Sequence, residues 1–404
     1  MNRVIKFIVV SLIIFNVTFL ISGCWDNRNI DDLALIKGIA LDTAEEDDRF
    51  KLTAHIVRPT PGEGGAEEQM EIDEPETISS TGYTLFEANR NLIKQIGRTP
   101  FYNHSDVIII SEEIARKGIK PYLDHLARNK EIRGRAKLII SKGEAAKILD
   151  TPHYLEDVIA VGLEKIVNGV ALSGTIIGTN LREFNIDLFD EKIDPVATAV
   201  ELREGGPEDE NNNNNQDDEQ NLVFSDGGAF FKGETFQDWF TRKEARGYNW
   251  VRNPGEVRGP VVCEVPVELE GNEVEKRISI EIVKSHSKIQ AELIENENNQ
   301  FKIVINVDAR GVIIEDIARN YEVLDTENIQ KLDKRFAQVI NNEIINTLKK
   351  SRKYQADVFG FARAVNNSYP QEYQEIKNDW DNIYQNIPVE INIVARIRRT
   401  GMLN

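Results

Sequence analysis

Cysteine and positive charge are both scarce in this chain of 404 residues. There are only two cysteines, Cys24 and Cys263, so modification of either one leaves no disulfide possible within the chain. Lysine and arginine together number 49 against 67 acids, which gives a formal net charge of −18. Because nucleic acids bind to basic surfaces, this imbalance argues against a nucleic-acid partner.

Recognisable catalytic and metal-binding motifs are also missing. Ser173 stands in the sequence ALSG, which lacks the first glycine of the G-x-S-x-G nucleophile elbow. The glycine-rich pieces around Gly64 and Gly227 are not followed by Lys-Ser/Thr, so neither is a phosphate loop. The histidines are too scattered for a local metal motif: His55, His104, His125, His153 and His286. The sequence therefore predicts no enzymatic activity, no metal site and no cofactor.

The first two dozen residues have the order of an export signal. Arg3 and Lys6 precede an apolar run over 7–21, and Ile-Ser-Gly-Cys follows, ending at Cys24. The alternatives are an ordinary signal peptide with a chance cysteine and an uncleaved membrane helix, although the run is shorter than the roughly 20 apolar residues that span a bilayer. The ending resembles a bacterial lipobox. That resemblance implies a lipoprotein signal peptide over 1–23 and an N-palmitoyl, S-diacylglycerol cysteine at Cys24.

Cleavage at this position makes the mature chain still more acidic. It removes Arg3, Lys6 and no acid, which takes the formal charge from −18 to −20. An anionic leaflet repels such a body as a whole. Attachment to a membrane must therefore come from the acyl chains, which hold a protein stably when two or more are present.

Residues 24–200 predict a mixed α/β domain. Thr84 and Glu87 form a capping box that opens a helix with one apolar face. Strand-like and helical segments then alternate, although an opening hairpin over 33–57 favours a mixed sheet. The remaining segments are strands at 107–110 and 136–140, a helical stretch at 112–129 with a break at Gly118 and Pro121, a short helix at 144–149, a segment at 158–167 that could be either, a helical turn or more at 181–189, and a strand at 195–201.

An acidic, asparagine-rich segment marks the clearest boundary. Residues 204–220 contain no aliphatic or aromatic side chain, so they cannot bury enough surface to offset their ordering entropy. We therefore expect a disordered linker over 201–220. Its acids lack the spacing around an obligatory glycine that an EF-hand requires, so calcium binding is not expected.

Residues 221–268 predict a small middle domain. A strand over 222–232 leads to an amphipathic helix over 236–245, and Gly247 is well placed to end it. A further strand over 261–269 has one wholly apolar side. Cys263 lies on that side and is expected in a core, while Pro266 restricts the strand to a sheet edge.

Residues 269–404 predict an α+β domain. Alternating apolar residues at 278–282, 289–294 and 303–307 are typical of an antiparallel meander. An apolar stripe over 325–353 predicts a long helix packed on that meander. A second helix and a final strand complete the domain, over 373–383 and 388–397.

These segments together resemble the Ger(x)C family, the lipoprotein C subunits of spore germinant receptors. The matching blocks occur in family order over essentially the whole mature chain, and the Asn-rich segment resembles an insertion. The blocks are Gly23–Asp26, Asp32–Ala34, Lys37–Asp42, HSDVIIISEEIARKG at 104–118, GAFFKGETFQDWFTRKEARGYNW at 228–250, KYQADVFG at 353–360, Trp380 and Arg398–Gly401.

The resemblance implies a three-domain α+β (mixed α/β) ectodomain without enzymatic activity. It would stand on the outer face of the spore inner membrane, anchored through Cys24. Its partners would be integral-membrane A and B subunits of a complex that responds to small nutrients. Whether this subunit itself binds a germinant is left open, and no ligand-contact residue of the family is carried over.

Two aromatic clusters are candidate contact surfaces. The first combines three large rings with cations, a composition that suits a protein interface, although a helix-turn-strand core is the alternative. Its candidate interface residues are Trp239, Arg242, Arg246, Tyr248 and Trp250. The second cluster, at the end of the long helix, is explained equally well by helix-end packing: Tyr354, Asp357, Phe359 and Phe361.

Two other classes compete with the receptor subunit. A free-standing solute-binding lipoprotein would have two similar α/β lobes around a cleft, whereas this chain ends in a meander and a long helix. A lipid-anchored hydrolase has no motif in its favour.

Overall fold

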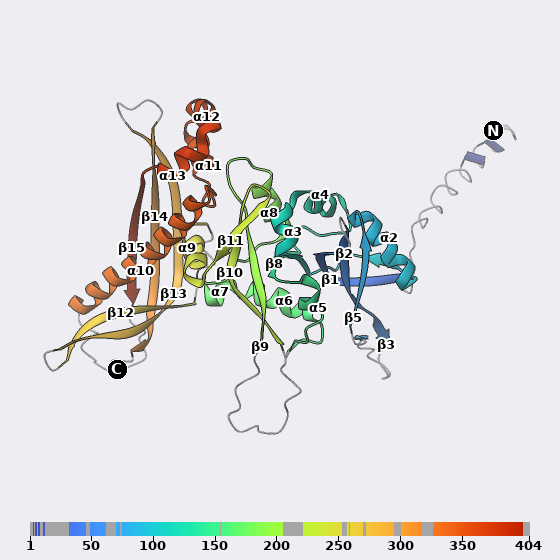
Figure 1. The fold of residues 1–404 in the computed structure, drawn as a ribbon, viewed down its shortest axis with the longest axis horizontal. Helices are drawn as coiled ribbons and strands as arrows, with labels where there is room; N and C mark the ends of the chain where they lie inside the picture. The colour runs from blue at the N-terminus through green and yellow to red at the C-terminus, as the bar shows by residue number, and fades with distance from the viewer. Residues whose placement is uncertain are drawn as a thin grey trace, which may run out of the picture.

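Two β-sheets lie end to end along the long axis of the molecule, as the computed structural model in Figure 1 shows. The segment of Cys24 and Trp25 lies outside the residues that the structure describes. The described residues are 3, 5, 7–8, 11–12, 32–45, 49–61, 70–72, 75–153, 155–204, 221–252, 257, 259–269, 272–294, 300–316 and 326–398.

The first sheet has nine strands with a parallel centre. Its order is β11-β10-β9-β8-β7-β1-β2-β5, and the short β6 pairs in parallel with the start of β1. Strands β1, β7, β8 and β9 run parallel to one another, while β2, β5, β10 and β11 add antiparallel edges. The strands are β1 Leu33–Thr43, β2 Phe50–Val57, β5 Glu76–Gly82, β6 Thr99–Phe101, β7 Val107–Ser111, β8 Lys137–Lys142, β9 Val196–Glu204, β10 Asn221–Lys232 and β11 Thr235–Phe240.

Helices cover both faces of this sheet, which is why its central strands are apolar throughout. Successive residues of β7 point to opposite faces: Ile108 enters one core cluster and Ile109 the other. The first cluster packs against α2 Leu85–Ile96, α3 Glu112–Lys117, α4 Lys120–Arg128 and α8 Leu181–Leu188, and the second against α5 Ala145–Leu149 and α6 Ile159–Asn168. A short α7, Val170–Ser173, and a two-stranded ribbon of β3 Pro59–Pro61 and β4 Met70–Ile72 complete this part.

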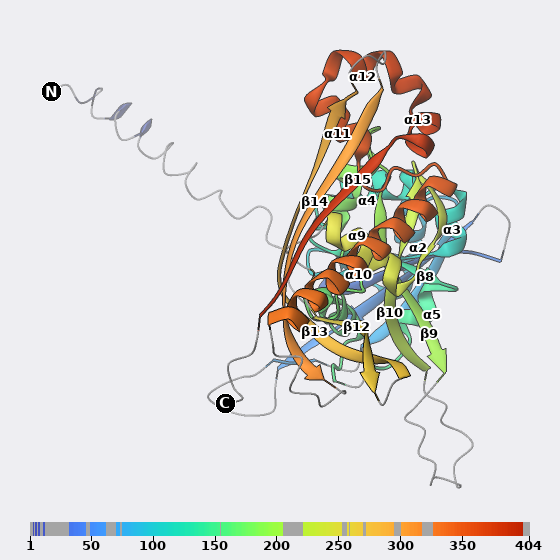
Figure 2. The ribbon, with the colours of Figure 1, turned by 90° about the vertical axis from the view of Figure 1, so that its left-hand side faces the viewer.

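The second sheet has four strands in the order β12-β13-β14-β15, and one long helix crosses it (Figure 2). The first three strands form an antiparallel meander in which β12 is the first strand, whereas β15 pairs in parallel with β14. A parallel pair needs a crossover connection, and the helices between β14 and β15 supply it. The elements are β12 Gly259–Leu269, β13 Asn272–Leu293, β14 Phe301–Asp316, α10 Thr326–Lys353, α11 Phe361–Ser368, α12 Pro370–Ile376, the 3-10 turn η4 Lys377–Asp379, α13 Trp380–Asn386 and β15 Val389–Arg398.

Most predicted elements of this half are confirmed. The apolar stripe of α10, which includes Leu332, Phe336 and Ile340, packs against the sheet. Cys263 is fully buried on β12, and β12 lies at the sheet edge as its proline requires. The mixed α+β fold class is thus confirmed. The two isoleucine-rich segments predicted as separate strands are one long strand, β13.

The predicted helix over 236–245 is wrong. Residues 235–240 form β11, which pairs with β10, and the helix α9 begins later and spans Arg242–Arg252. The reason is burial on the pleated sheet: Phe236 and Phe240 are both about 2% exposed in the apolar core. Gly247 does not end a helix but lies inside α9, where the helix meets α10.

Residues 221–268 are shared between the two sheets. Strand β10 begins by pairing Asn221 with Glu204 of β9, so β10 and β11 extend the first sheet. Strand β12 pairs with β13 and opens the second sheet. The middle segment, predicted as a separate domain, is therefore divided between the two sheets: β10 and β11 belong to the first and β12 to the second. Helix α9 connects the two halves (Figure 1).

We predict that Gly247→Ala lowers the free energy of unfolding by about 1–3 kcal/mol or more, because a Cβ here overpacks the α9–α10 contact. The added carbon would lie 2.2 Å from Thr347 Oγ1 and 2.3 Å from the Glu343 carbonyl oxygen. Chemical denaturation measures the loss. The exposed Lys243→Ala on the same helix is the matched control, and equal stability of the two variants would contradict the close contact.

Candidate functional site: the buried junction between the two sheets

The two sheets share one hydrophobic core across their junction. This cluster joins Val196 and Phe230 of the first sheet to Ile280 and Phe336 of the second half, with Trp250 of α9 among them. Trp250 is fully buried and its ring meets that of Phe336 edge-on at 6.3 Å. The halves are therefore packed against each other, and they do not form two lobes around an open cleft.

The five predicted interface residues fall into two groups. Trp239 is partly exposed, with its ring packed against Phe236, and the exposed Arg242 pairs with Asp226. The other three, Arg246, Tyr248 and Trp250, face inward at the junction, with Tyr248 only 5% exposed. Arg246 and Trp250 contact Glu343 of α10, whereas the Tyr248 ring lies on the other side of α9 near Phe240 and Phe359. The core alternative therefore describes all three residues.

Glu343 of α10 is the polar centre of this contact. Its carboxylate is buried and accepts hydrogen bonds from Arg246 Nε at 3.0 and 3.1 Å and from Trp250 Nε1 at 2.9 Å. Arg246 Nη1 also donates to the Pro260 carbonyl of β12 at 3.0 Å. One ion pair therefore connects α9, α10 and β12, and removal of either partner would leave a buried charge uncompensated.

A second buried carboxylate, Asp357, organises the turn between α10 and α11. It accepts hydrogen bonds from the backbone N–H groups of Gly360, Phe361 and Ala362 at 2.8–2.9 Å, and from Trp380 Nε1 at 3.2 Å. The carboxylate thus satisfies the free amides at the start of α11. The helix-end packing alternative accounts for this residue, and the motif KYQADVFG is a structural turn.

Asp194 connects that turn to the first sheet. Its two carboxylate oxygens accept from the backbone N–H groups of Asp357 and Gly233, each at 2.7 Å. The Asp194 N–H donates to the Asp357 carbonyl at 3.0 Å. Lys232 lies between Asp194 and Asp381, at 3.4 and 2.6 Å. Residues more than 150 positions apart in the chain are therefore fixed against one another.

Three further ion pairs close one side of the junction. Asp187 of α8 pairs with Arg252 of α9 and Arg363 of α11, each at 2.9 Å, and Arg363 also pairs with Asp190 at 2.9 Å. These side chains are only partly exposed. Beside them is a cavity of about 290 Å³, lined by Gly178, Thr179, Glu183, Phe184, Ile186, Asp187, Val196, Tyr248, Arg252 and Arg363.

Burial shifts the titration of both aspartates. It raises the pKa of Asp357 to about 6, although the hydrogen bonds from Ala362 and Phe361 act in the opposite direction. Burial also raises the pKa of Asp194, against the opposing effect of Lys232. The two carboxylates lie close to each other, and the negative charge of Asp194 further favours the protonated form of Asp357.

Sequence reasoning singled out Asp357 and the cations of α9 but missed Asp194 and Glu343. Glu343 occurs in a helix as one acid among 67, and no local signal separates it from its exposed neighbours. Within the described ranges, no three or more His, Cys, Asp or Glu side chains come together as metal ligands. Among the same residues, no helix has both the length and the apolar character to cross a membrane.

Comparison with known families agrees with the fold and its order of elements. Residues 26–202 match the spore germination protein N-terminal domain, and residues 226–401 match the spore germination B3/GerAC-like C-terminal domain. Together these two matches cover most of the chain. It belongs to the GerAC-like family of spore germination proteins. The Ger(x)C resemblance is therefore confirmed, and with it a role in spore germination.

The relatives of this family member extend over nearly the whole chain. The putative spore germination protein YfkR of Bacillus subtilis (strain 168) is 26% identical over 96% of this chain and 95% of its own length. Spore germination protein KC of the same organism is 24% identical over 95% of this chain and 93% of its own length. The crystal structure of the GerBC protein covers 89% of this chain and 96% of its own, with a TM-score of 0.51 and 19% identity, which supports the fold.

We predict that Asp357→Asn changes how stability depends on pH. The folded pKa of about 6 lies above the unfolded value of about 3.9, so the folded state binds an extra proton between these values. The stabilisation from this group is therefore present below about pH 4 and is lost as the pH rises to 6. The advantage of the wild type over the variant should fall by up to about 3 kcal/mol across that window.

Denaturation midpoints at pH 4, 5, 6 and 7 measure the difference. Asp379→Asn, at an exposed position in η4, controls for the loss of one carboxylate. A difference between wild type and Asp357→Asn that stays constant with pH would contradict the raised pKa.

Proposed function

We propose that this chain is the lipid-anchored, non-catalytic C subunit of a spore germinant receptor. It is held through Cys24 on the outer face of the spore inner membrane, beside integral-membrane A and B subunits. The observation that carries the proposal is that the lipobox-like pattern lies directly before the family's N-terminal domain in the sequence. The lipobox-like Ile-Ser-Gly-Cys ends at residue 24, and the match to the family's N-terminal domain begins at residue 26.

The junction supports a mechanical role for the subunit. The shared core and the carboxylates of Glu343, Asp357 and Asp194 hold the two halves as one body. A body of this kind transmits a displacement from one end to the other, because packed interiors deform little. The subunit therefore holds or relays a state of the receptor complex.

We expect Cys24→Ala to leave the ectodomain folded and to abolish both membrane retention and the germination response to nutrients. The thioether is the attachment point in the proposed mechanism, and the acidic body has no other strong attraction to a bilayer. Membrane fractionation and germination assays of spores that carry the variant measure the two effects. Cys263→Ala, which removes the buried thiol instead, should retain the anchor, and a normal nutrient response of Cys24→Ala spores would rule the mechanism out.

The solute-binding lipoprotein makes the opposite prediction for ligand binding. Isothermal titration calorimetry of the purified chain with a panel of amino acids and sugars separates the two classes. We expect no submicromolar binding, because the shared core fills the place where a cleft between lobes would lie. Tight binding of one nutrient by the isolated chain would favour the solute-binding class.

A further inference from the structure

The outer face of helix α2 differs in charge from the acidic body to which it belongs. Three exposed residues spaced four positions apart, Phe86, Arg90 and Lys94, lie along this face, and the exposed Arg98 follows the helix just after its C-cap glycine, Gly97. The Arg90 guanidinium lies 5.0 Å from the centre of the Phe86 ring. The opposite face, with Leu85, Ala88 and Leu92, is buried in the first core. We call the four exposed residues the α2 stripe.

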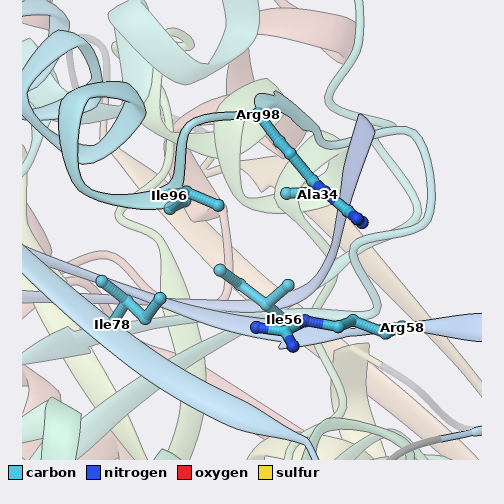
Figure 3. Close-up of a pocket in the computed structure, with 6 residues that line it drawn as sticks. All are labelled: Ala34, Ile56, Arg58, Ile78, Ile96 and Arg98. Atoms are coloured by element: carbon cyan, nitrogen blue, oxygen red, sulfur yellow. The ribbon is translucent and has the colours of Figure 1, made fainter. Parts of the chain in front are cut away.

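The α2 stripe leads to a pocket of about 210 Å³, shown in Figure 3. Aliphatic side chains of Ile56, Ile78 and Ile96 gather around it, with Ala34 behind, and two arginines lie at its sides. Arg58 pairs with Glu76 at 2.8 Å, and both are about half exposed. Arg98 has no acidic partner among the described residues.

The pocket lies beside the start of β1, the first strand of the fold. Strand β6 directly follows Arg98 and pairs in parallel with the beginning of β1, with Leu33 opposite Thr99 and Ala34 opposite Pro100. The pocket and the end of the stripe therefore lie where the chain enters its first strand. Figure 1 shows α2 at the end of the molecule that is farthest from the second sheet.

The proposed anchor keeps this end close to the bilayer. Eight Cα–Cα steps separate Cys24 from Asp32, and such a segment spans at most about 29 Å when fully extended. A surface tethered at that distance meets the lipid headgroups at a high effective concentration. Any weak affinity of this face for lipid is thereby strengthened.

We propose that the α2 stripe and the adjoining pocket dock on the anionic phospholipid headgroups of the bilayer that holds the anchor. A lipid phosphate binds between Arg58 and Arg98, and the aliphatic wall contacts the glycerol and the first methylenes. The inference rests on the proposed lipid anchor and adds the orientation of the body on the membrane.

The chemistry of the face favours a lipid over other anions. Guanidinium groups bind phosphate by paired hydrogen bonds, and an exposed ring beside cations is typical of membrane-interface segments. An inorganic ion would make no use of Ile56, Ile78 or Phe86. The net charge of the whole body does not prevent docking, because charges beyond about 8–10 Å are screened at physiological salt. Of the described acids near this face, Glu76 is already paired with Arg58, and Glu87 accepts a hydrogen bond from the Tyr83 N–H.

The test uses the full-length lipidated protein in phosphatidylcholine vesicles with and without phosphatidylglycerol, with a headgroup spin label as quencher. A bimane probe is placed by Gln95→Cys on α2 or, for comparison, by Gln330→Cys on α10, and Cys263 is buried and stays unlabelled. We expect quenching at the α2 position only, and only when phosphatidylglycerol is present.

The triple variant Arg90→Gln, Lys94→Gln, Arg98→Gln should lower the ratio of docked to undocked protein on the order of a hundredfold, since each cation near an anionic surface contributes about fivefold. The matched control neutralises three exposed lysines elsewhere, Lys243→Gln, Lys349→Gln and Lys353→Gln, and should leave quenching unchanged. All six positions are exposed, so both variants should keep the wild-type unfolding midpoint.

Several outcomes would overturn the inference. The first is the absence of quenching at the α2 position in the wild type, and the second is an equal loss of quenching in the two triple variants. The third is loss of quenching on addition of inorganic phosphate at constant ionic strength, which would indicate a free-phosphate site. A germination defect of the α2 variant with unchanged quenching would point to a protein partner and would also overturn it. Vesicle flotation separates this failure from failure of the anchor, because the α2 variant should still float whereas Cys24→Ala should not.

Discussion

The structure depends on the burial of carboxylates between its two halves. Glu343 and Asp357 are both nearly inaccessible to solvent. Glu343 accepts hydrogen bonds from Arg246 and Trp250, more than 90 residues earlier. Asp357 accepts from nearby amides and from Trp380, and its own backbone N–H donates to the distant Asp194. Burial of a charge is costly unless hydrogen bonds replace the lost water, so the geometry of these donors must be maintained together. Arg246 for Glu343, and the amides at the start of α11 for Asp357, meet that requirement. The relative position of the two sheets follows from it.

This constraint is consistent with the holding role proposed above. Among the described residues the shared core fills the junction between the halves, and the cavity beside Arg252 and Arg363 is bordered by ion pairs. At the far end of the first sheet, α2 presents cations and an exposed ring next to the start of the fold. A rigid body with one face directed to its membrane would present the second sheet at a fixed distance from the bilayer.

Much of the fold could be predicted because the relevant signals are local. The buried strand β7 is a continuous apolar run, and the α10 stripe repeats with helical spacing over 28 residues. The edge position of β12 follows from Pro266, which cannot donate to a neighbouring strand. The segment over 235–252 was harder, since aromatic residues separated by polar ones satisfy both a strand and a helix pattern. Pairing with β10 decided between them.

The sequence by itself determined the class of most elements and the family, and it alone carries the predictions of an export signal and a lipid-bearing Cys24, because each of these patterns is formed by neighbours in the chain. Only the tertiary structure decided that Tyr248, Trp250 and Arg246 face inward and that Gly247 lies at a helix contact. It also decided that β15 runs parallel to β14. The physical reason is distance along the chain: the burial of α9 depends on Glu343 and its neighbours nearly a hundred residues later, and no local pattern records that partner.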